Sequence, residues 1–89
     1  MANCWKKMRF GKDWGPEFRK KTKDATEYIR VMFDDELDHP SWIVSIGTVE
    51  KEGKMDAYTT EDAIITGDNK ESAMKRAKEL IRAEGGLCK

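Results

Sequence analysis

Aliphatic and aromatic core residues are scarce in this 89-residue chain. Leu, Ile, Val and Phe together number 15, about 17% of all residues. Chains below about 20% that also carry a large net charge are typically disordered. Here Lys+Arg and Asp+Glu are both 17, so the net charge is zero. We therefore expect one small folded domain, residues 1–89, with a thin core.

Long apolar runs are also missing. No segment approaches the ~18 apolar residues that a membrane span needs. The first residues, 1–7, lack the apolar stretch of a secretory signal. These absences favour a cytoplasmic protein that does not bind membranes.

Cysteine and histidine are too few for a zinc site. The chain has two cysteines, Cys4 and Cys88, and one histidine, His39. Structural zinc needs about four ligands, usually in closely spaced pairs. We expect no metal and no cofactor. A disulfide between the two ends stays open as an alternative, but free thiols are the expectation in a reducing cytosol.

Catalytic motifs are absent as well. The chain has no glycine-rich phosphate loop, no Gly-x-Ser-x-Gly turn and no zinc-protease motif. The segment Asp34–His39 holds four carboxylates and the imidazole, yet its spacing is not that of a calcium loop. It reads as a solvated loop or a recognition surface. We therefore expect a protein that is not an enzyme and assign no catalytic residue.

Charge is balanced in total but divided along the chain. Residues 1–23 hold eight basic and two acidic residues, a charge of +6. Residues 24–68 hold three basic and twelve acidic residues, a charge of −9. Residues 69–89 carry +3, from six basic and three acidic residues. Such a separation produces local fields that steer binding partners.

A C-terminal helix is the clearest element in the pattern. Asp68 suits the N-cap position, with Glu71 three residues later as in a capping box. Gly85 and Gly86 provide the stop signal. The apolar residues fall on one stripe at helical spacing: Ala73, Met74, Ala77, Leu80 and Ile81. The pattern predicts a helix over residues 69–84, with its cap at residue 68.

Strands are predicted before this helix. Residues 26–33 and 42–50 alternate with a period of two, and Trp42, Val44 and Ile46 share one face. Residues 50–54 predict a tight hairpin with Gly53 at positive φ. The returning strand covers residues 55–59. It either continues to residue 66 after a bulge at residues 60–62 or gives way there to a separate short strand.

The N-terminal third allows two interpretations. Residues 1–25 read either as a basic, aromatic arm or as a short strand within residues 4–10 followed by a helix over 16–25, with Pro16 at its first position. The predicted fold class is α+β. It has a three- to four-stranded antiparallel sheet over residues 26–66, the C-terminal helix on one face and, with the N-terminal helix, the order αβββα.

Residues 64–78 resemble the last strand and helix of double-stranded-RNA-binding domains. Lys70 and Ala73 match that family's pattern, whereas Glu71 and Met74 stand where the family has lysines. The same stretch is similar to the strand-to-helix joint of HicB-type antitoxins. Either resemblance implies a sheet packed against a helix, and the first would imply phosphate contacts from the helix start.

Our leading functional hypothesis is a non-catalytic protein that binds another protein through an acidic surface. In size and style the chain resembles the small accessory proteins of phages and mobile elements, so we expect it to inhibit or modulate a host protein, such as a nucleic-acid-binding enzyme. A homodimer stays open. The partner-binding residues would be Asp34, Asp35, Glu36, Asp38, Glu50, Glu52 and Asp56.

The alternative hypothesis is a nucleic-acid-binding module. Its basis is the N-terminal mixture of cations, which neutralise phosphates, with aromatic rings, which stack on bases. The residues assigned to it are Lys6, Lys7, Arg9, Trp14, Arg19, Lys20 and Lys21.

Overall fold

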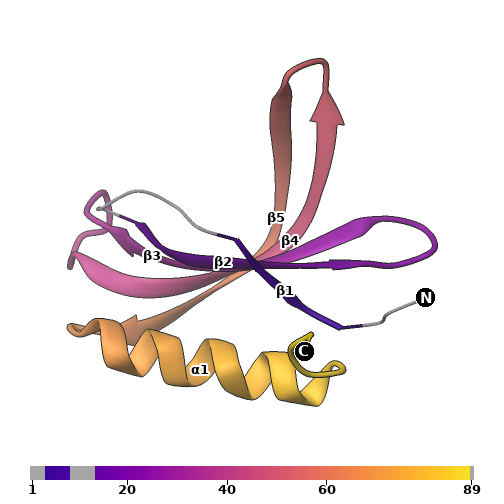
Figure 1. Cartoon of the computed structure of the whole chain (residues 1–89). Helices are drawn as coiled ribbons and strands as arrows, with labels where there is room; N and C mark the ends of the chain where they lie inside the picture. The colour runs from indigo at the N-terminus through magenta and orange to yellow at the C-terminus, as the bar shows by residue number, and fades with distance from the viewer. Residues whose placement is uncertain (1–3, 9–13, 89) are drawn as a thin grey trace.

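Five antiparallel strands and one helix build the molecule. The computed structural model describes residues 4–8 and 14–88. The elements follow in the order β1 (Lys6–Met8), β2 (Trp14–Lys21), β3 (Thr26–Asp34), β4 (Ser41–Glu52), β5 (Met55–Gly67) and α1 (Lys70–Ala83). The strands form one sheet in sequence order, with β1 and β5 at its edges, and α1 packs on one face over β3, β4 and β5 (Figure 1). The predicted small α+β domain is confirmed, but the sheet has five strands, not three or four.

The predicted N-terminal helix is wrong, because its first half is strand β2. Phe18 is buried at 2% exposure in the core beneath α1, while Glu17 points to the opposite face of the sheet. This alternation with a period of two places β2 between β1 and β3. Pro16 lies in the bulge between Trp14 and Glu17, where a strand tolerates proline. The short strand expected within residues 4–10 is β1.

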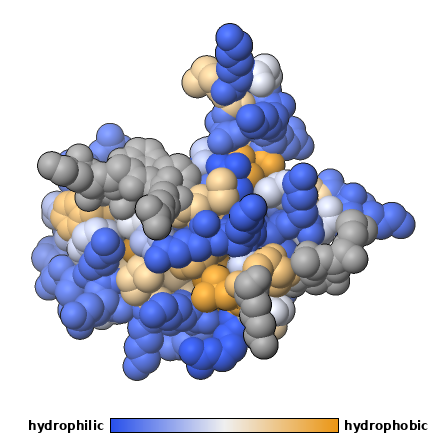
Figure 2. Space-filling model, viewed as in Figure 1, coloured by the Kyte–Doolittle hydropathy of each residue, from blue (hydrophilic) through white to orange (hydrophobic). Residues whose placement is uncertain are grey.

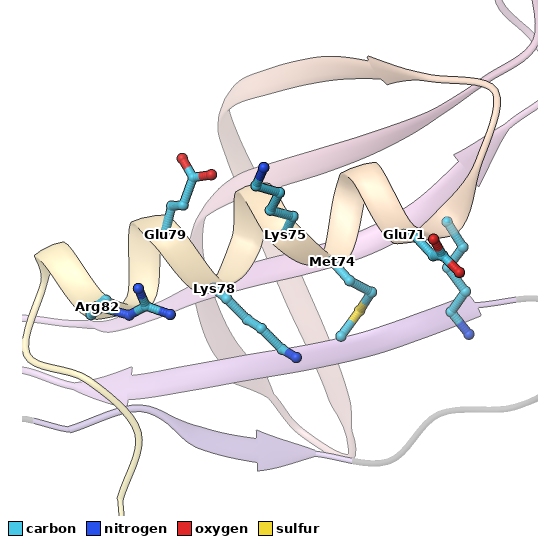
Figure 3. Close-up of a pocket in the computed structure, with 7 residues that line it drawn as sticks. Glu71, Met74, Lys75, Lys78, Glu79 and Arg82 are labelled. Atoms are coloured by element: carbon cyan, nitrogen blue, oxygen red, sulfur yellow. The ribbon is translucent and has the colours of Figure 1, made fainter.

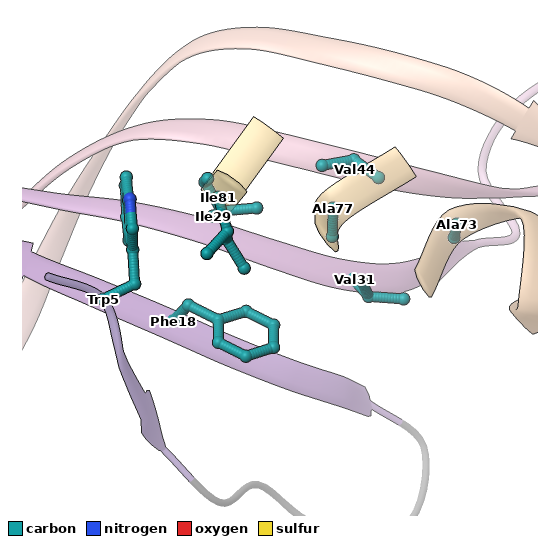
Figure 4. Packing of buried hydrophobic residues seen from close by; sticks show 8 residues of the cluster. All are labelled: Trp5, Phe18, Ile29, Val31, Val44, Ala73, Ala77 and Ile81. Atoms are coloured by element: carbon teal, nitrogen blue, oxygen red, sulfur yellow. The ribbon is translucent and has the colours of Figure 1, made fainter. Parts of the chain in front are cut away.

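The core lies between the sheet and α1 (Figure 4). Its five sheet residues come from the N-terminal segment and from β2, β3 and β4, and its three helix residues lie one turn apart. They are Trp5, Phe18, Ile29, Val31 and Val44 from the sheet side and Ala73, Ala77 and Ile81 from α1. The small alanines let the helix approach the sheet closely, so a thin set of apolar residues suffices to exclude water. The predicted apolar stripe of the helix is confirmed.

Helix α1 begins at Lys70, one residue later than predicted. Asn69, not Asp68, is the N-cap, and its side chain accepts a hydrogen bond from the backbone N–H of Ser72 at 2.9 Å. The helix ends before Gly85 and Gly86, whose φ angles are 113° and 78°. The glycine stop signal is therefore confirmed.

The β4–β5 hairpin bends sharply away from the side that α1 covers (Figure 1). Its turn contains Gly53 at a φ of 65°, as predicted. The bend follows a bulge, because Ile46 pairs with Asp62 and Gly47 with Thr60. At Gly47 a Cβ would lie 1.9 Å from the carbonyl oxygen of Thr59. A side chain at position 47 would therefore clash with β5, and the bend requires glycine there. We call residues 48–60, beyond this position, the hairpin arm.

The two ends of the chain are joined. Cys4 and Cys88 form a disulfide, with their Cα atoms 5.0 Å apart, so the expectation of free thiols is wrong. Backbone hydrogen bonds of 2.8 Å run from Trp5 N–H to the Gly86 carbonyl and from Cys88 N–H to the Trp5 carbonyl. Together they attach the start of the chain to the end of α1.

Hydrophilic side chains cover most of the face seen in Figure 2, including the hairpin arm. Over the described residues, no helix has both the length and the apolar character that crossing a bilayer requires.

Candidate functional site

The seven predicted acidic residues do not form one surface. Asp34 ends β3, and Asp35, Glu36 and Asp38 lie in the β3–β4 loop. Glu50 and Glu52 lie at the far end of β4, and Asp56 pairs with Lys51 beside them on β5. Roughly 30 Å of β4 separates the two groups at the usual rise per residue. The structure therefore splits the predicted site into a loop group and an arm group.

The loop group gains a neighbour from the β5–α1 junction. His39 Nε2 lies 3.4 Å from Asp68 Oδ1, and both side chains are more than 80% exposed. Within the loop, Asp34 Oδ1 accepts a hydrogen bond from the backbone N–H of Glu36 at 3.0 Å, which fixes the turn. We call the resulting surface the acidic end. It consists of Asp34, Asp35, Glu36, Asp38 and Asp68.

Within the part of the chain that the structure describes, the carboxylates of the acidic end have no lysine or arginine partner. Among residues 4–8 and 14–88, none of them forms an ion pair with a lysine or an arginine, and the His39–Asp68 contact is the one ionic approach. The same residues contain no cluster of three or more side chains placed to hold a metal ion. This end therefore presents concentrated negative charge to solvent.

The arm group is engaged in a different way. Asp56 Oδ2 accepts a hydrogen bond from Arg19 Nη2 at 3.0 Å, so the structure pairs an acid of one predicted site with a base of the other. Glu50 and Glu52 are exposed near the hairpin turn. Of the arm group, Asp56 is thus occupied within the molecule itself.

A buried carboxylate lies at the base of the hairpin arm. Glu17 is fully buried. Its Oε1 accepts hydrogen bonds from Arg30 Nε at 2.8 Å and Arg30 Nη2 at 2.6 Å. Its Oε2 accepts from Arg19 Nε and, at 3.1 Å, from Tyr58 Oη. We call Glu17, Arg19, Arg30, Asp56 and Tyr58 the Glu17 network; it has two formal charges of each sign.

Aromatic contacts complete this network. The Arg30 guanidinium lies 4.1 Å from the Tyr58 ring centroid, and Tyr28 meets Tyr58 edge to face with centroids 4.9 Å apart. Tyr28 Oη also contacts Thr60 Oγ1 at 2.7 Å and Ser45 Oγ at 3.0 Å. Among the described residues, no buried side-chain nitrogen or oxygen lacks a hydrogen-bond partner.

The network raises the pKa values of Arg19 and Tyr58. Burial alone would lower the pKa of Arg19, but the hydrogen bonds to Glu17 and Asp56 outweigh it and raise that pKa above its ordinary value. Burial, reinforced by the hydrogen bond to Glu17, raises the pKa of Tyr58. Arg19 thus stays charged and Tyr58 stays a donor at neutral pH. With its carboxylate enclosed, Glu17 ties the arm to the sheet.

Sequence reasoning missed Glu17, Arg30 and Tyr58. The detectable signal was the alternation around Phe18, where charged neighbours flank a buried aromatic. A helical interpretation of residues 16–25 conceals that alternation.

The predicted basic site is also divided. Lys20 is 8% exposed, donates to the Glu84 carbonyl at 3.0 Å and stacks over the Trp5 ring. Arg19 belongs to the Glu17 network. Lys6, Lys7 and Lys21 are exposed. Arg9 and the side chain of Trp14 lie outside the described residues.

A groove of about 650 Å³ lies beside the hairpin arm. Its lining joins β1, the end of β2 and the arm, and brings together three residues of the predicted basic site (Lys6, Arg19 and Lys21), two of the predicted acidic site (Glu50 and Asp56) and Lys51, which belonged to neither. The Cys4–Cys88 disulfide also lines it. Four cations against two carboxylates leave the groove with an excess of positive charge.

A second hollow, of about 550 Å³, follows the outer side of α1 (Figure 3). In this view Met74 and Lys78 project to one side of the helix, while Lys75 and Glu79 project to the other. Arg76 pairs with Glu79 at 3.6 Å. Alternating charges of this kind are typical of a solvated helix face and provide no convergent polar groups.

A comparison of the chain with protein-family models, with curated proteins and with solved structures finds no match.

Proposed function

We propose that this protein is a non-catalytic binding protein whose acidic end docks on a basic surface of a partner protein. The supporting observation is the contrast between two kinds of carboxylate. Glu17 and Asp56 are matched by arginines inside the molecule, whereas the acidic end has no lysine or arginine partner among the described residues. Uncompensated, exposed charge of one sign on a neutral chain is a recognition feature.

The electrostatics favour a basic partner. Five carboxylates crowded at one end repel one another in the free protein, and cations of a partner relieve that repulsion on binding. A nucleic-acid-binding protein presents such cations where it normally contacts phosphates. Occupying that surface would inhibit or modulate the partner, in the manner of phage and mobile-element accessory proteins.

The test compares two charge reversals at opposite ends of β4. One variant changes the loop group to lysine at positions 34, 35, 36 and 38, and the matched control is Glu50→Lys with Glu52→Lys. The partner is captured from bacterial lysate by the tagged wild-type protein after nuclease treatment, then purified for titration against each variant. We expect the loop variant to lose binding and the control to retain it, with melting temperatures verifying that both fold. Equal binding by both variants would refute the proposal.

The groove supports a second candidate function, binding of nucleic acid. Lys6, Lys21 and Lys51 gather there beside Arg19. Binding would then weaken steeply with salt, because released counterions drive it. The test titrates labelled DNA and RNA oligonucleotides at low and physiological salt with Lys6→Glu, Lys21→Glu and the wild type. Binding that changes neither with salt concentration nor with these substitutions would show that the groove is not the binding site.

A further inference from the structure

The outer edge of β5 has no strand paired with it among the described residues. This strand has 13 residues and closes the sheet at one side. Among the described residues, no backbone group outside the sheet pairs with it. It contains no lysine, arginine or proline; of the features that usually block an exposed edge it has acidic side chains, at Glu61 and Asp62, and a bulge. Bulges at Glu61 and at Thr66 interrupt its pairing with β4, and the run of residues 63–66 follows the first of them.

One backbone donor on this edge is visibly directed outward. The Ala63 N–H donates to the side chain of Asp62 at 2.9 Å, so it points away from β4. Backbone groups alternate in direction along an antiparallel strand, and the Ile65 N–H therefore points outward too. The Asp62 carboxylate stands where the carbonyl of an added strand would accept the same hydrogen bond.

The side chains on this edge favour a basic, apolar neighbour. Glu61 and Asp62 are exposed, and neither forms an ion pair with another described residue. Ile65 is 61% exposed on the face away from α1, beside Ile43 of β4. A partner strand with alternating basic and apolar residues would match both features.

A second copy of this chain is a poor occupant. Glu61 is the central residue of β5. Antiparallel pairing of two β5 strands about a two-fold axis at that centre would set Glu61 opposite Glu61, with Asp62 beside it. Like charges directly opposite one another destabilise a strand pair. The acids therefore disfavour self-association and favour a segment of opposite charge.

We propose that the outer edge of β5 over residues 63–66 accepts an extended, lysine- or arginine-containing segment of a partner protein as an additional strand. The segment's carbonyl replaces the Asp62 carboxylate on the Ala63 N–H, and the released carboxylate pairs with a basic side chain of the segment. Main-chain hydrogen bonds supply affinity, and Ile65 supplies an apolar contact. The proposal rests on the proposed function in requiring a basic partner, but it concerns a separate surface.

The probes are three capped octapeptides. One alternates Lys with Val, the second alternates Lys with Pro, and the third alternates Glu with Val. The first two carry the same charge, but proline removes every second N–H and resists strand pairing. We expect the Lys–Val peptide to bind about tenfold more tightly than the Lys–Pro peptide and to slow hydrogen exchange at the Ala63 and Ile65 amides. Equal affinity for the two lysine peptides would mean simple charge attraction and would overturn the proposal.

Two variants locate the site on β5. Ile65→Pro removes the outward N–H and is expected to abolish the preference for Lys–Val over Lys–Pro, whereas Ile65→Ala keeps the N–H and keeps the preference. The double variant Glu61→Lys, Asp62→Lys is expected to bind the Glu–Val peptide more tightly than the Lys–Val peptide, which reverses the order of the wild type. Should Ile65→Pro fail to fold, as judged from its melting curve, the charge reversal and the exchange data still decide. Unchanged peptide selectivity in the charge reversal would contradict the proposal.

The same peptides separate this proposal from the proposed function. Lysine at positions 34, 35, 36 and 38 is expected to leave the Lys–Val preference over Lys–Pro and the protection of the Ala63 amide intact. If peptide binding instead follows the loop charges and ignores Ile65→Pro, strand addition is refuted while docking at the acidic end stands.

Discussion

Reduction of the Cys4–Cys88 disulfide is expected to lower the free energy of unfolding by about 4.6 kcal/mol at 25 °C. The bond joins residues separated by 84 positions. For a closed loop of that size, the chain-entropy relation removes about 15 cal/mol/K from the unfolded state. Domains of 89 residues are stable by roughly 4–13 kcal/mol, so the bond carries a third or more of the total.

The effect should fall on the unfolded chain and leave the native structure in place. Trp5 is 3% exposed in the core, its indole Nε1 donates to the Glu84 carbonyl at 3.2 Å, and its backbone pairs with Gly86 and Cys88. None of these contacts involves sulfur. The start of the chain therefore stays attached to the end of α1 when the disulfide is opened.

Urea denaturation followed by far-ultraviolet circular dichroism tests this reasoning on oxidised protein, on protein in a thiol-free reductant and on a Cys4→Ser, Cys88→Ser variant. The reduced protein and the variant should unfold at a matching, lower urea midpoint. Their denaturant slope should rise, because the unfolded chain without a cross-link exposes more surface. A difference below about 1 kcal/mol would refute the chain-entropy account. Loss of amide protection at residues 5–8 in the reduced native protein would show that the bond acts on the folded state instead.

Three further predictions concern the hairpin arm. Glu17→Gln should cost about 3–5 kcal/mol in urea denaturation, because it removes a fully buried carboxylate that Arg19 and Arg30 share, whereas Asp56→Asn at the exposed rim should cost less than about 1 kcal/mol; similar losses for both would contradict the distinction. The raised pKa of Tyr58 contributes stability that is fully present below its unfolded value of about 10 and is lost as the pH rises through the folded value. The melting temperature should therefore fall as the pH rises above about 10, and it should fall less steeply in Tyr58→Phe. The same pH dependence in both proteins would show that the Tyr58 phenol does not cause the loss of stability. Gly47→Ala should lower the free energy of unfolding by about 1–3 kcal/mol, because its Cβ would meet the Thr59 carbonyl oxygen. An unchanged urea midpoint would show that β4 and β5 move apart locally to accommodate the methyl group.

Patterns within one element were enough to predict β3, β4, the hairpin turn and α1. In each, neighbouring residues carry the signal, such as the alternation of Val44 with Ser45 or the glycine at position 53. Strand β2 was missed because the spacing of Phe18 and Thr22 also fits a helix, and only pairing with β1 and β3 decides. Asn69 replaced Asp68 as N-cap because two adjacent residues offer the same chemistry.

The candidate sites were harder to predict because charges were grouped by distance along the chain. Glu17, Arg30 and Tyr58 are brought together by strand register. The bulge predicted at residues 60–62 is present in a continuous β5, but no local pattern indicates which residues of β2, β3 and β5 meet across the sheet. The same register joins Asp56 to Arg19, across the two sites that the sequence had separated. The loop group was found because its acids are consecutive.

The Cys4–Cys88 disulfide does not fit the expected cytoplasmic location. Disulfides persist in oxidising environments and are rare in a reducing cytosol. If the chain works in a reducing compartment, it loses the stabilisation of the Cys4–Cys88 bond and relies on the core and the Glu17 network. The compartment therefore stays a prediction, and the disulfide is the observation that bears on it most directly.

The fold treats its carboxylates in two ways, and that difference supports an interaction role. Glu17 and Asp56 lie within reach of arginine cations and hold the arm to the sheet. Asp34, Asp35 and Asp38 lie within five consecutive residues, where like charges repel one another. Their mutual repulsion works against folding, and a chain with 17 basic residues has cations available to oppose it. Residues that reduce stability can be retained because function requires them, so we propose that a partner binds at the acidic end, whose carboxylates have no lysine or arginine partner among the described residues.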